Sequence, residues 1–530
     1  MFKNLFSVFL LFVSITSFSQ QNSLLKDAKK IEEIYNYINY MYVDDVNSKE
    51  VTEAAIVAAL EKLDPHSVYI SKEDVDDANQ QINGNFVGVG IRFQLLKDTL
   101  IVVATIPGGP SEKVGLRAGD KIIMVGGENI ANVKLKNSQV REKLMGELGT
   151  KVKVLVLRKG EPNNLSFEIT RDKIPVYSVD CHYMITPETG YLKLNSFSHT
   201  TTDEIKASLA DLRKKGMKNL ILDLQDNGGG LMYAAKTVSD EFLTKDKLVV
   251  YSQGKHQPRQ DMNCDSKGEF EKGKLLVLVN ENSASASEIV SGAIQDWDRG
   301  LVVGRRTYGK GLVQRPIDLS DGSQIRLTIA RYYTPSGRNI QKPYEGNSEE
   351  YHNDVLKRLK HGELMNQDSI KFPDSLKYKT LVKQRTVYGG GGIMPDVFVP
   401  LDTTEFTKYF RAILGTGAFN TFSLTYVNKN REKFKTNYPT FETYVAKFNC
   451  DQAFMDEFFQ YIAKEHPTLK LEEKEYPESE KLVKLFLKAM VAQDYWGNTE
   501  FYKIYNERNA ILQAALKTLK NGSYEKAGLE

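Results

Sequence analysis

The sequence predicts a multidomain α/β protein with helical regions at both ends. Between residues 174 and 400, short apolar runs that suit buried strands alternate with helical segments, which is the pattern of an α/β core. Apolar residues recur at helical spacing before residue 84 and again after residue 405. The chain has 530 residues, enough for about three or four domains of roughly 100–200 residues each.

Composition argues against a nucleic-acid-binding protein. The 71 Lys and Arg residues nearly balance the 68 Asp and Glu residues, the two signs are interleaved, and no long basic stripe is present. Neutralising phosphates needs clustered positive charge. Hydrophobic residues make up 41% of the chain, so a core can form without metal or disulfides. Cys181, Cys264 and Cys450 are best interpreted as three unpaired thiols, although one bridge remains open.

The N-terminus has the features of a secretory signal. Lys3 precedes an apolar run from Leu5 to Val13, and Ser17 and Ser19 form an A-x-A-like site. We therefore expect residues 1–19 to be a cleaved signal peptide, and the mature protein to be exported to the periplasm. An uncleaved anchor, which would leave the protein membrane-associated, is the alternative, but the run is short for a membrane span.

Two regions precede the α/β core. Residues 20–83 are expected to be helical, with apolar residues at positions 31, 34, 35 and 38 and a second run at 51–60. From residue 84 to 172, β-type runs punctuated by Gly and Pro predict a compact domain with strands at 86–93, 100–106, 121–125 and 152–157. A helix is expected near 137–148.

The core is expected at residues 173–404. Its runs at 220–224 and 274–279 are typical of buried strands, and each leads through a small-residue loop into a helix. Residues 341–388 are polar and charged, which predicts a surface insertion. Residues 405–530 combine aromatic and Lys/Glu-rich helical patterns and are expected to form a helical C-terminal domain.

Ser285 is a candidate nucleophile. Residues 281–288 read ENSASASE and lie between a predicted strand and a predicted helix. A serine at such a turn exposes its hydroxyl near free backbone N–H groups, and small neighbours leave room for a substrate backbone. Serines also cap helices at this position, and the segment alone fits both roles.

A serine nucleophile needs a base. The seven histidines lie in no recognisable triad context. Lys310 is the candidate instead, because burial lowers a lysine pKa and a neutral amine can accept the serine proton. Gly309 and Gly311 flank it, and Gln314 could hold the amine. A lysine in a Gly-rich turn is the alternative on local grounds.

A glycine-rich turn follows the strand at 220–222. Residues 223–230 read DLQDNGGG. Such a turn presents N–H groups that could stabilise an oxyanion. It lacks both the Walker ending and G-x-G-x-x-G, so a phosphate loop is disfavoured, and a plain turn is the alternative.

Together, these segments resemble the carboxy-terminal processing peptidases, or tail-specific proteases, of the S41 type. The resemblance covers roughly residues 60–400. It rests on seven motifs in the family's order, namely 86–91 (FVGVGI), 118–120 (AGD), 223–230 (DLQDNGGG), 283–288 (SASASE), 308–311 (YGKG) with Gln314, 332–338 (YYTPSGR) and 392–396 (GIMPD). It implies a PDZ domain inserted before a mixed α/β, crotonase-like S41 protease core.

The resemblance also assigns site residues. It implies a Ser/Lys dyad of Ser285 and Lys310 with Gln314 positioning the lysine, and an oxyanion hole formed by the N–H groups of Ala286 and Gly229. Asp296 is expected to be structural.

The family's D-L-R-x-N-P-G-G loop carries Arg and Pro where this chain has Gln225 and Gly228. The missing Arg removes a potential charge partner. It also leaves the choice of glycine in the oxyanion hole open.

A PDZ domain binds an extended C-terminal peptide as an added strand. Gly88, Val89, Gly90 and Ile91 are the expected site for the tail carboxylate. The resemblance therefore implies a serine endopeptidase that cleaves proteins near their C-termini, with tail binding aligning the distant dyad. No cofactor or metal is required. A non-catalytic PDZ-based scaffold is the alternative, and a homo-oligomer or an adaptor protein remains open as a partner.

Overall fold

The computed structural model describes residues 25–96, 98–344, 348–469 and 475–529. The predicted signal peptide, residues 1–19, lies outside them. The chain divides into two units, one comprising Met1–Lys72 and Pro316–Leu327, the other Glu73–Arg315 and Thr328–Glu530. Among the helices of the described residues, none is both long and apolar enough to cross a bilayer.

The first unit is mostly helical. Residues 25–41 are helical, and α2 (Ser48–Glu61) follows. A turn at Asp64, whose Oδ1 accepts the N–H groups of His66 and Ser67, then leads into the strand β1 (Val68–Ile70). This strand pairs antiparallel with the start of β18 (Gln324–Tyr333). The predicted helical region at 20–83 thus contains a strand, because the Asp-Pro break frees a short β-branched and aromatic run to pair.

The core of the second unit is a six-stranded sheet. Its order is β10-β11-β12-β15-β16-β21. The last five strands run parallel, and β10 is antiparallel to β11. The strands are β10 (Val179–Thr186), β11 (Thr189–Leu194), β12 (Asn219–Asp223), β15 (Leu275–Val279), β16 (Leu301–Gly304) and β21 (Val397–Phe398).

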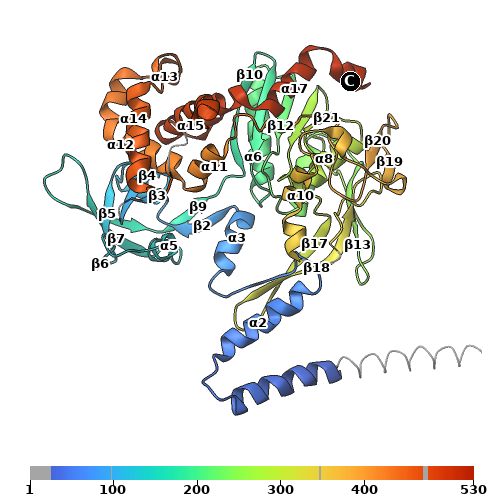
Figure 1. Cartoon of the computed structure of the whole chain (residues 1–530), viewed down its shortest axis with the longest axis horizontal. Coiled ribbons are helices and arrows are strands. Elements are labelled where there is room, and N and C mark those ends of the chain that lie inside the picture. Colours follow the sequence, from blue (N-terminus) through green and yellow to red (C-terminus); the bar gives the residue numbers. More distant parts are fainter. Residues whose placement is uncertain (1–24, 97, 345–347, 470–474, 530) are drawn as a thin grey trace, which may run out of the picture. The chain divides into compact units, whose positions relative to one another are not determined.

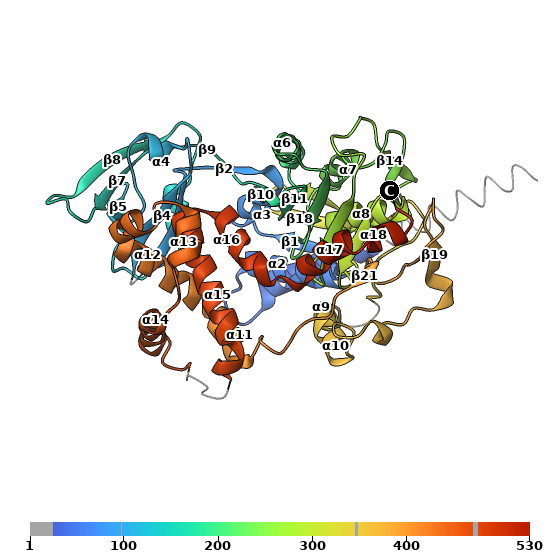
Figure 2. The same cartoon turned by 90° about the horizontal axis from the view of Figure 1, so that it is seen from above.

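Both faces of this sheet are covered. On one face, Leu222 and Val277 pack with α6 (Thr201–Lys214), α7 (Met232–Asp240) and α8 (Ala286–Asp296). On the other face, alternate residues of the same strands pack against α17 (Ala510–Lys520) and α18 (Ser523–Lys526). Figure 2 shows the strands between α6 and α7 on one side and α17 on the other. Burial on both faces explains the continuous apolar runs of these strands.

A second sheet carries the segment that contains Lys310. In it, β13 (Leu248–Gln253) lies between β14 (Gln260–Asn263) and β18, and β17 (Leu312–Asp318) also pairs with β18. Lys310 lies two residues before the start of β17. The site residues therefore come from two sheets, with Ser285 following a strand of the core sheet.

Residues 85–175 form a small β-rich domain. Its main sheet has the order β3-β4-β5-β7-β8, with β6 (Glu128–Asn129) paired to β5 and β3 at one edge. The helix α3 (Val75–Asn83) precedes this domain. The other bounds are β2 (Asn85–Gly88), β3 (Ile91–Leu96), β4 (Thr99–Thr105), α4 (Pro110–Lys113), β5 (Lys121–Val125), α5 (Asn137–Leu144), β7 (Lys151–Leu157), β8 (Leu165–Thr170) and β9 (Asp172–Pro175).

The strand predicted at 86–93 is two strands. The extended conformation is interrupted between β2 and β3, where Gly90 adopts a positive φ of 73°. This conformation favours glycine, and a side chain there would also place its Cβ 2.9 Å from the Ile174 Cδ1 and 3.1 Å from the Pro110 Cδ. The helix expected at 137–148 ends earlier, at Leu144.

A helical bundle with an aromatic core follows the core sheet (Figure 1, orange). Its helices are α11 (Lys408–Gly415), α12 (Ala418–Asn437), α13 (Phe441–Lys447), α14 (Gln452–Glu465), α15 (Tyr476–Tyr495) and α16 (Asn498–Tyr505). The last two helices, α17 and α18, pack instead on the core sheet. The predicted C-terminal helical domain at 405–530 therefore divides its packing between two cores.

The segment at 341–388 is more than a surface insertion. It contains α9 (Ser348–His352), α10 (Asp354–Lys360) and the hairpin β19 (Lys377–Lys379) and β20 (Thr386–Tyr388). Arg358 is 2% exposed and donates hydrogen bonds to the carbonyls of Arg306 (2.6 Å) and Thr307 (3.1 Å). Its polar composition misled the prediction, because here a buried guanidinium satisfies backbone carbonyls.

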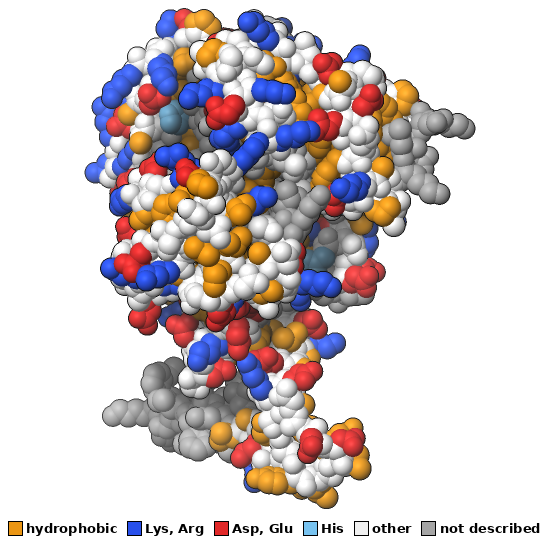
Figure 3. Space-filling view, turned by 90° about the vertical axis from the view of Figure 1, so that its left-hand side faces the viewer, with side chains coloured by type: hydrophobic (Ala, Val, Ile, Leu, Met, Phe, Trp, Pro, Cys, Tyr) orange, Lys and Arg blue, Asp and Glu red, His pale blue; other side chains and the backbone are white. Residues whose placement is uncertain are grey.

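Charged side chains of both signs are mixed on the face shown in Figure 3. This mixture agrees with the near balance of basic and acidic residues in the sequence. The three cysteines are all buried and free.

Candidate active site

Ser285 lies on a strained turn between β15 and α8. Its backbone has φ 55° and ψ −113°, a region that non-glycine residues rarely occupy. Such a conformation costs of the order of 1–3 kcal/mol and persists only where surrounding contacts fix it. The neighbours Ala284 and Ala286 are buried, whereas Ser285 is only half-buried. The turn thus presents the serine hydroxyl while its flanks are packed.

Lys310 and Gln314 lie together, as predicted. Lys310 Nζ donates to Gln314 Oε1 at 3.0 Å, and Lys310 is half-buried. Both flanking glycines are required by close packing. A Cβ on Gly309, whose φ is +87°, would lie 3.1 Å from backbone atoms of the 391–392 turn, and one on Gly311 would lie 2.8 Å from the Gln341 nitrogen.

Glu288 connects the Ser285 turn to the Lys310 segment. Its Oε2 accepts the N–H groups of Ser285 (2.8 Å) and Lys310 (2.9 Å). Its Oε1 accepts the Gly309 N–H (2.7 Å) and the Thr307 hydroxyl (2.5 Å). One carboxylate therefore fixes the backbone of both candidate catalytic residues.

The carboxyl of Glu288 is fully buried. Burial raises its pKa to about 7, and the four donated hydrogen bonds oppose that rise. Three of the four partners are backbone N–H groups, which cannot accept a proton, and the fourth, the Thr307 hydroxyl, already accepts the Ile393 N–H. The ionised form therefore matches the geometry of the site.

Tyr332 makes the complementary link through carbonyl groups. Its hydroxyl lies 3.1 Å from the Ser285 carbonyl oxygen and also contacts the Lys310 carbonyl oxygen. The ring is 1% exposed, and burial raises the pKa of Tyr332 well above its usual value, so the hydroxyl keeps its proton. Glu288 holds the N–H groups of the two residues, and Tyr332 lies against their C=O groups.

Sequence reasoning assigned no role to Glu288 or Tyr332. For Glu288, a signal existed, because a Glu three residues after a Ser at a helix start has the spacing of a capping box. Tyr332 is 47 residues from Ser285 and carries no local signal. Both residues lie inside motifs on which the family resemblance rests, but neither had been given a chemical role.

The two residues assigned to the oxyanion hole are brought next to Ser285. A Cβ on Gly229, whose φ is +99°, would lie 2.8 Å from the Ser285 Cβ and 2.9 Å from the Ala286 nitrogen. Ala286 begins α8, so its N–H has no preceding helical carbonyl. The Gly229 N–H, however, donates to Asn227 Oδ1 at 2.9 Å and is thus engaged within its own loop.

The glycine-rich loop is anchored by a buried charge pair at its base. Asp223 accepts hydrogen bonds from the Tyr191 hydroxyl (2.6 Å) and the Gln225 N–H (2.8 Å), and it pairs with Lys193 Nζ at 3.3 Å. Lys193 is 5% exposed and also donates to the Gln225 carbonyl. Lys193 on β11 thus places a positive charge beside Asp223, where the family motif has an Arg at the position of Gln225.

The predicted carboxylate site borders a groove in the small β-rich domain. Gly88, Val89, Gly90 and Ile91 all line a cavity of about 420 Å³ between β3 and α5. The Val89 and Gly90 carbonyls are occupied, since Val89 accepts from Ser111 and Gly90 from Ile106. These bonds fix the loop at the end of the groove.

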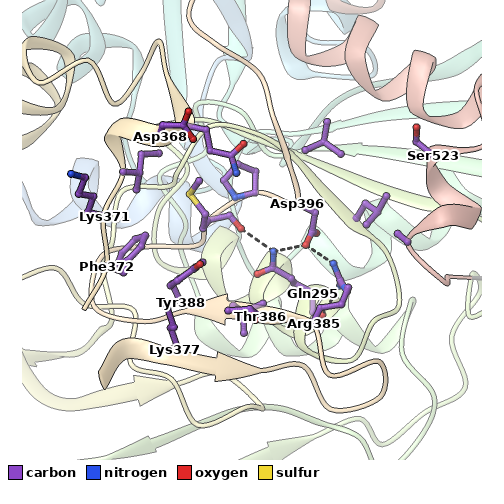
Figure 4. A pocket seen from close by; sticks show the side chains of 18 residues that line it. Gln295, Asp368, Lys371, Phe372, Lys377, Arg385, Thr386, Tyr388, Asp396 and Ser523 are labelled. Atoms are coloured by element: carbon purple, nitrogen blue, oxygen red, sulfur yellow. Dashed lines mark hydrogen bonds and ion pairs between the residues drawn. The ribbon is translucent and has the colours of Figure 1, made fainter. Parts of the chain in front are cut away.

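A second cavity lies at the far end of α8 from Ser285. It measures about 860 Å³ and includes neither Ser285 nor Lys310 in its lining. In Figure 4, Gln295 and Arg385 both contact Asp396, at 3.1 and 2.5 Å. Gln295, Arg385 and Asp396 thus satisfy one another's polar groups at this cavity.

Asp296 has the structural surroundings expected for it. It is fully buried and pairs with Arg338, which is also fully buried, at 2.7 Å. Asp296 also accepts the Ser336 N–H at 2.9 Å. The pair ties the end of α8 to the segment after β18.

Four family descriptions match the sequence. "Peptidase family S41" matches residues 188–347, and "PDZ domain" matches residues 101–158. "Activating protease CtpB N-terminal domain" matches residues 13–74, and a family of unknown function matches residues 409–497.

Curated relatives carry related names. The chain is 36% identical over 334 residues to a "Carboxy-terminal-processing protease" of Bartonella bacilliformis, covering 62% of this chain and 75% of that protein. It is 33% identical over 316 residues to a "Probable CtpA-like serine protease" of Staphylococcus saprophyticus, covering 59% of this chain and 63% of that protein.

Among solved structures, the "Photosystem II D1 C-terminal processing protease" shares 30% sequence identity, with a TM-score of 0.33. The alignment covers 59% of this chain and 90% of that one.

Proposed function

Because this chain belongs to peptidase family S41, we propose that it is a serine endopeptidase that cleaves proteins near their C-termini. Ser285 is the nucleophile and Lys310 the general base. The observation that carries this proposal is the shared anchorage of the two residues, since Glu288 binds the N–H groups of both. A plain helix cap at Ser285 would not need Lys310 fixed by the same carboxylate.

The proposed chemistry is acyl transfer through a Ser/Lys dyad. The neutral Lys310 amine, held by Gln314 Oε1 at 3.0 Å, takes the proton of the Ser285 hydroxyl as its oxygen attacks the peptide carbonyl. The C–N bond then breaks, and Lys310 passes the proton to the leaving amine. Lys310 next accepts a proton from a water molecule as the water oxygen attacks the acyl ester, and it returns that proton to the Ser285 oxygen when the ester C–O bond breaks.

The oxyanion of each tetrahedral intermediate would lie beside Ala286 and Gly229. The Ala286 N–H is a donor at the start of α8. The Gly229 N–H can join it only after leaving Asn227 Oδ1. The proposed active arrangement therefore includes a rotation of the peptide unit that precedes Gly229.

We further propose that the PDZ domain binds the substrate tail. We also propose that the protein is exported to the periplasm, because its N-terminus has the features of a secretory signal. The core is proposed to be crotonase-like, with the PDZ domain inserted before it. Homo-oligomerisation or an adaptor that engages the helical bundle is part of the same proposal.

A tail-swap assay tests the proposed function. The chain from Gln20 onward is incubated with a loosely folded protein that ends in an apolar residue, or with the same protein ending in Asp-Asp. We expect faster cleavage of the apolar-tailed protein, because the PDZ groove has an apolar floor. Intact mass spectrometry identifies the products. Equal rates would reject tail selection, and an absence of cleavage with retained peptide binding would favour a non-catalytic scaffold.

Glu288→Gln should lower kcat/KM by about 100-fold, a loss comparable with removal of one oxyanion-hole donor. The amide of Gln would turn two N–H donors toward groups that are themselves donors. Circular dichroism and thermal unfolding should show that the variant is folded. Activity within about threefold of wild type would mean that Glu288 does not position the dyad.

The pH profile gives an independent test of Glu288. Its pKa is about 7, so a falling pH adds a proton and removes the negative acceptor shared by four donors. The rate of the wild type should therefore fall as the pH drops through about 7 and recover above it. In Glu288→Gln, the fall in kcat/KM near pH 7 that is due to this carboxyl should be absent from the pH profile measured over the same range. An unchanged acid limb in the variant would assign that limb to another group.

A further inference from the structure

The groove of the PDZ domain has an electrostatic character as well as an apolar floor. The residues lining it are Gln80, Phe86, Gly88, Val89, Gly90, Ile91, Arg92, Phe93, Gln94, Asn137, Arg141, Leu144 and Met145. They include two guanidinium groups, Arg92 and Arg141, and none of these thirteen residues is acidic. A ligand that only buried apolar surface would not need this charge.

The end of the groove where the tail carboxylate would lie is identified by its contacts. Met145, directly after α5, lies near the carboxylate loop, because a Cβ on Gly88 would be 3.7 Å from the Met145 Cγ. Leu144, the last residue of α5, lines the groove beside Met145. The last side chain of a tail would therefore meet Leu144 and Met145.

Arg141 lies one helical turn back from this end. It is three residues before Leu144 in α5, so the two side chains share a face of the helix and are about 4.5 Å apart along its axis. In an extended tail, side chains two residues apart share a face and are about 6.6–6.8 Å apart. The side chain two residues before the last one is therefore the one placed opposite Arg141.

The edge strand β3 sets which tail side chains face α5. Ile91 and Phe93 pack against the domain core, so Arg92 between them is directed to the opposite side of the strand. A tail added alongside β3 has the same alternation. Arg141 is thus the guanidinium on the face toward α5. Arg92 shares the other face of β3 with Gln94, which donates to the Thr421 hydroxyl of the helical bundle.

Among the residues that the structure describes, Arg141 has one ion-pair partner, and that contact is weak. Its Nη1 is 3.9 Å from Asp77 Oδ2, and both side chains are about half exposed, at 56% and 52%. Asp77 is also engaged by Gln80 Nε2, which donates to its Oδ1 at 2.8 Å. A tail carboxylate can therefore pair with Arg141 without breaking a buried ion pair.

Resting on the proposed tail-reading function, we infer that this groove selects tails that end in an apolar residue and carry Asp or Glu two residues before it, with Arg141 as the residue that reads the acidic side chain. The substrate class is thus a protein with a mixed apolar and acidic C-terminus. Arg141 determines specificity and does not touch the reacting atoms.

Peptide binding to the full chain carrying Ser285→Ala tests this inference, because that variant cannot consume the ligand by the proposed mechanism. Fluorescein-labelled peptides would end in the same apolar residue and differ only two residues before it, with Glu, Gln or Lys there. Anisotropy should show that the Glu peptide binds about three- to fivefold more tightly than the Gln peptide at low salt, as a half-exposed ion pair allows. The Lys peptide should bind most weakly, and high salt should reduce the differences.

Three variants locate the effect. Arg141→Gln should remove the preference for Glu while leaving affinity for the Gln peptide within about twofold. Asp77→Asn should strengthen binding of the Glu peptide, because it removes the competing carboxylate. Lys159→Gln, an exposed residue of the same domain outside the groove, should leave the preference intact.

The outcomes separate this inference from the proposed function. The inference would be overturned if the Ser285→Ala chain with an otherwise unchanged PDZ domain bound the Glu and Gln peptides equally. It would also be overturned if the chain carrying Arg141→Gln kept the full preference for the Glu peptide. A peptide with an amidated C-terminus tests the proposed function itself. If the amide bound as tightly as the free acid, carboxylate recognition would be wrong, whatever the charge preference.

Discussion

Ser285→Ala should abolish proteolysis, with a fall in kcat/KM of about 10⁴- to 10⁶-fold. The serine oxygen forms the acyl bond in the proposed mechanism. The neighbouring hydroxyls of Ser283 and Ser287 are buried and donate to backbone carbonyls of the glycine-rich loop. Binding of tail peptides should be unchanged, because the groove is formed by a separate domain. The comparison is initial rates on one apolar-tailed protein, with products identified by intact mass.

Ser291→Ala is the matched control. Ser291 is also in α8, and its hydroxyl lies within hydrogen-bond distance of two backbone carbonyls of the same helix, those of Ser287 (2.8 Å) and Glu288 (3.5 Å). Its loss should leave the rate within about threefold of wild type. If Ser285→Ala cleaved the substrate at a comparable rate, Ser285 would be excluded as the nucleophile.

Lys310→Arg should lower kcat/KM by about 10²- to 10⁴-fold, the range that general acid–base catalysis supplies. Arginine stays protonated and cannot accept the serine proton. The charge is retained, so a purely electrostatic role for Lys310 predicts a much smaller loss. Lys255→Arg, at an exposed position, controls for the substitution.

Restoring an amine should restore the rate. Lys310→Cys treated with 2-bromoethylamine regains a side chain of nearly the length of lysine, and activity should rise at least about tenfold over the untreated variant. The native cysteines are buried, and burial raises the pKa of Cys264 and Cys450 to about 12, which slows their alkylation. Full activity of Lys310→Arg, or no recovery after alkylation, would contradict the role of Lys310 as base.

Local chemistry in the sequence identified candidates but did not decide between their roles. Small residues between a strand and a helix made Ser285 a candidate nucleophile or a helix cap, and flanking glycines made Lys310 a candidate base or a turn residue. The resemblance to the S41 family assigned the dyad and Gln314. The structure brings Lys310 and Gln314 into a hydrogen bond. Their catalytic roles stay predictions. The strand-and-helix pattern of the core was also readable, because strands buried on both faces are continuously apolar.

Features that depend on distant segments were not predictable. Lys193 pairs with Asp223 from a neighbouring parallel strand, and nothing near position 225 indicates that a buried lysine compensates for the missing Arg. Arg358 supports the carbonyls of Arg306 and Thr307 from a segment whose polarity suggested a surface. The packing of α17 on the core sheet likewise depends on which apolar face is left uncovered, and helical spacing alone does not specify that.

Trapping the acyl-enzyme tests the central claim most directly. The wild-type chain is mixed with an excess of an activated peptide ester, quenched in acid, digested and mapped by tandem mass spectrometry. The account predicts that the acyl group is found on Ser285 and on no other residue, and that no adduct forms in Ser285→Ala. An acyl group on a different side chain, or cleavage of the ester without any adduct on Ser285 under conditions that slow deacylation, would contradict it.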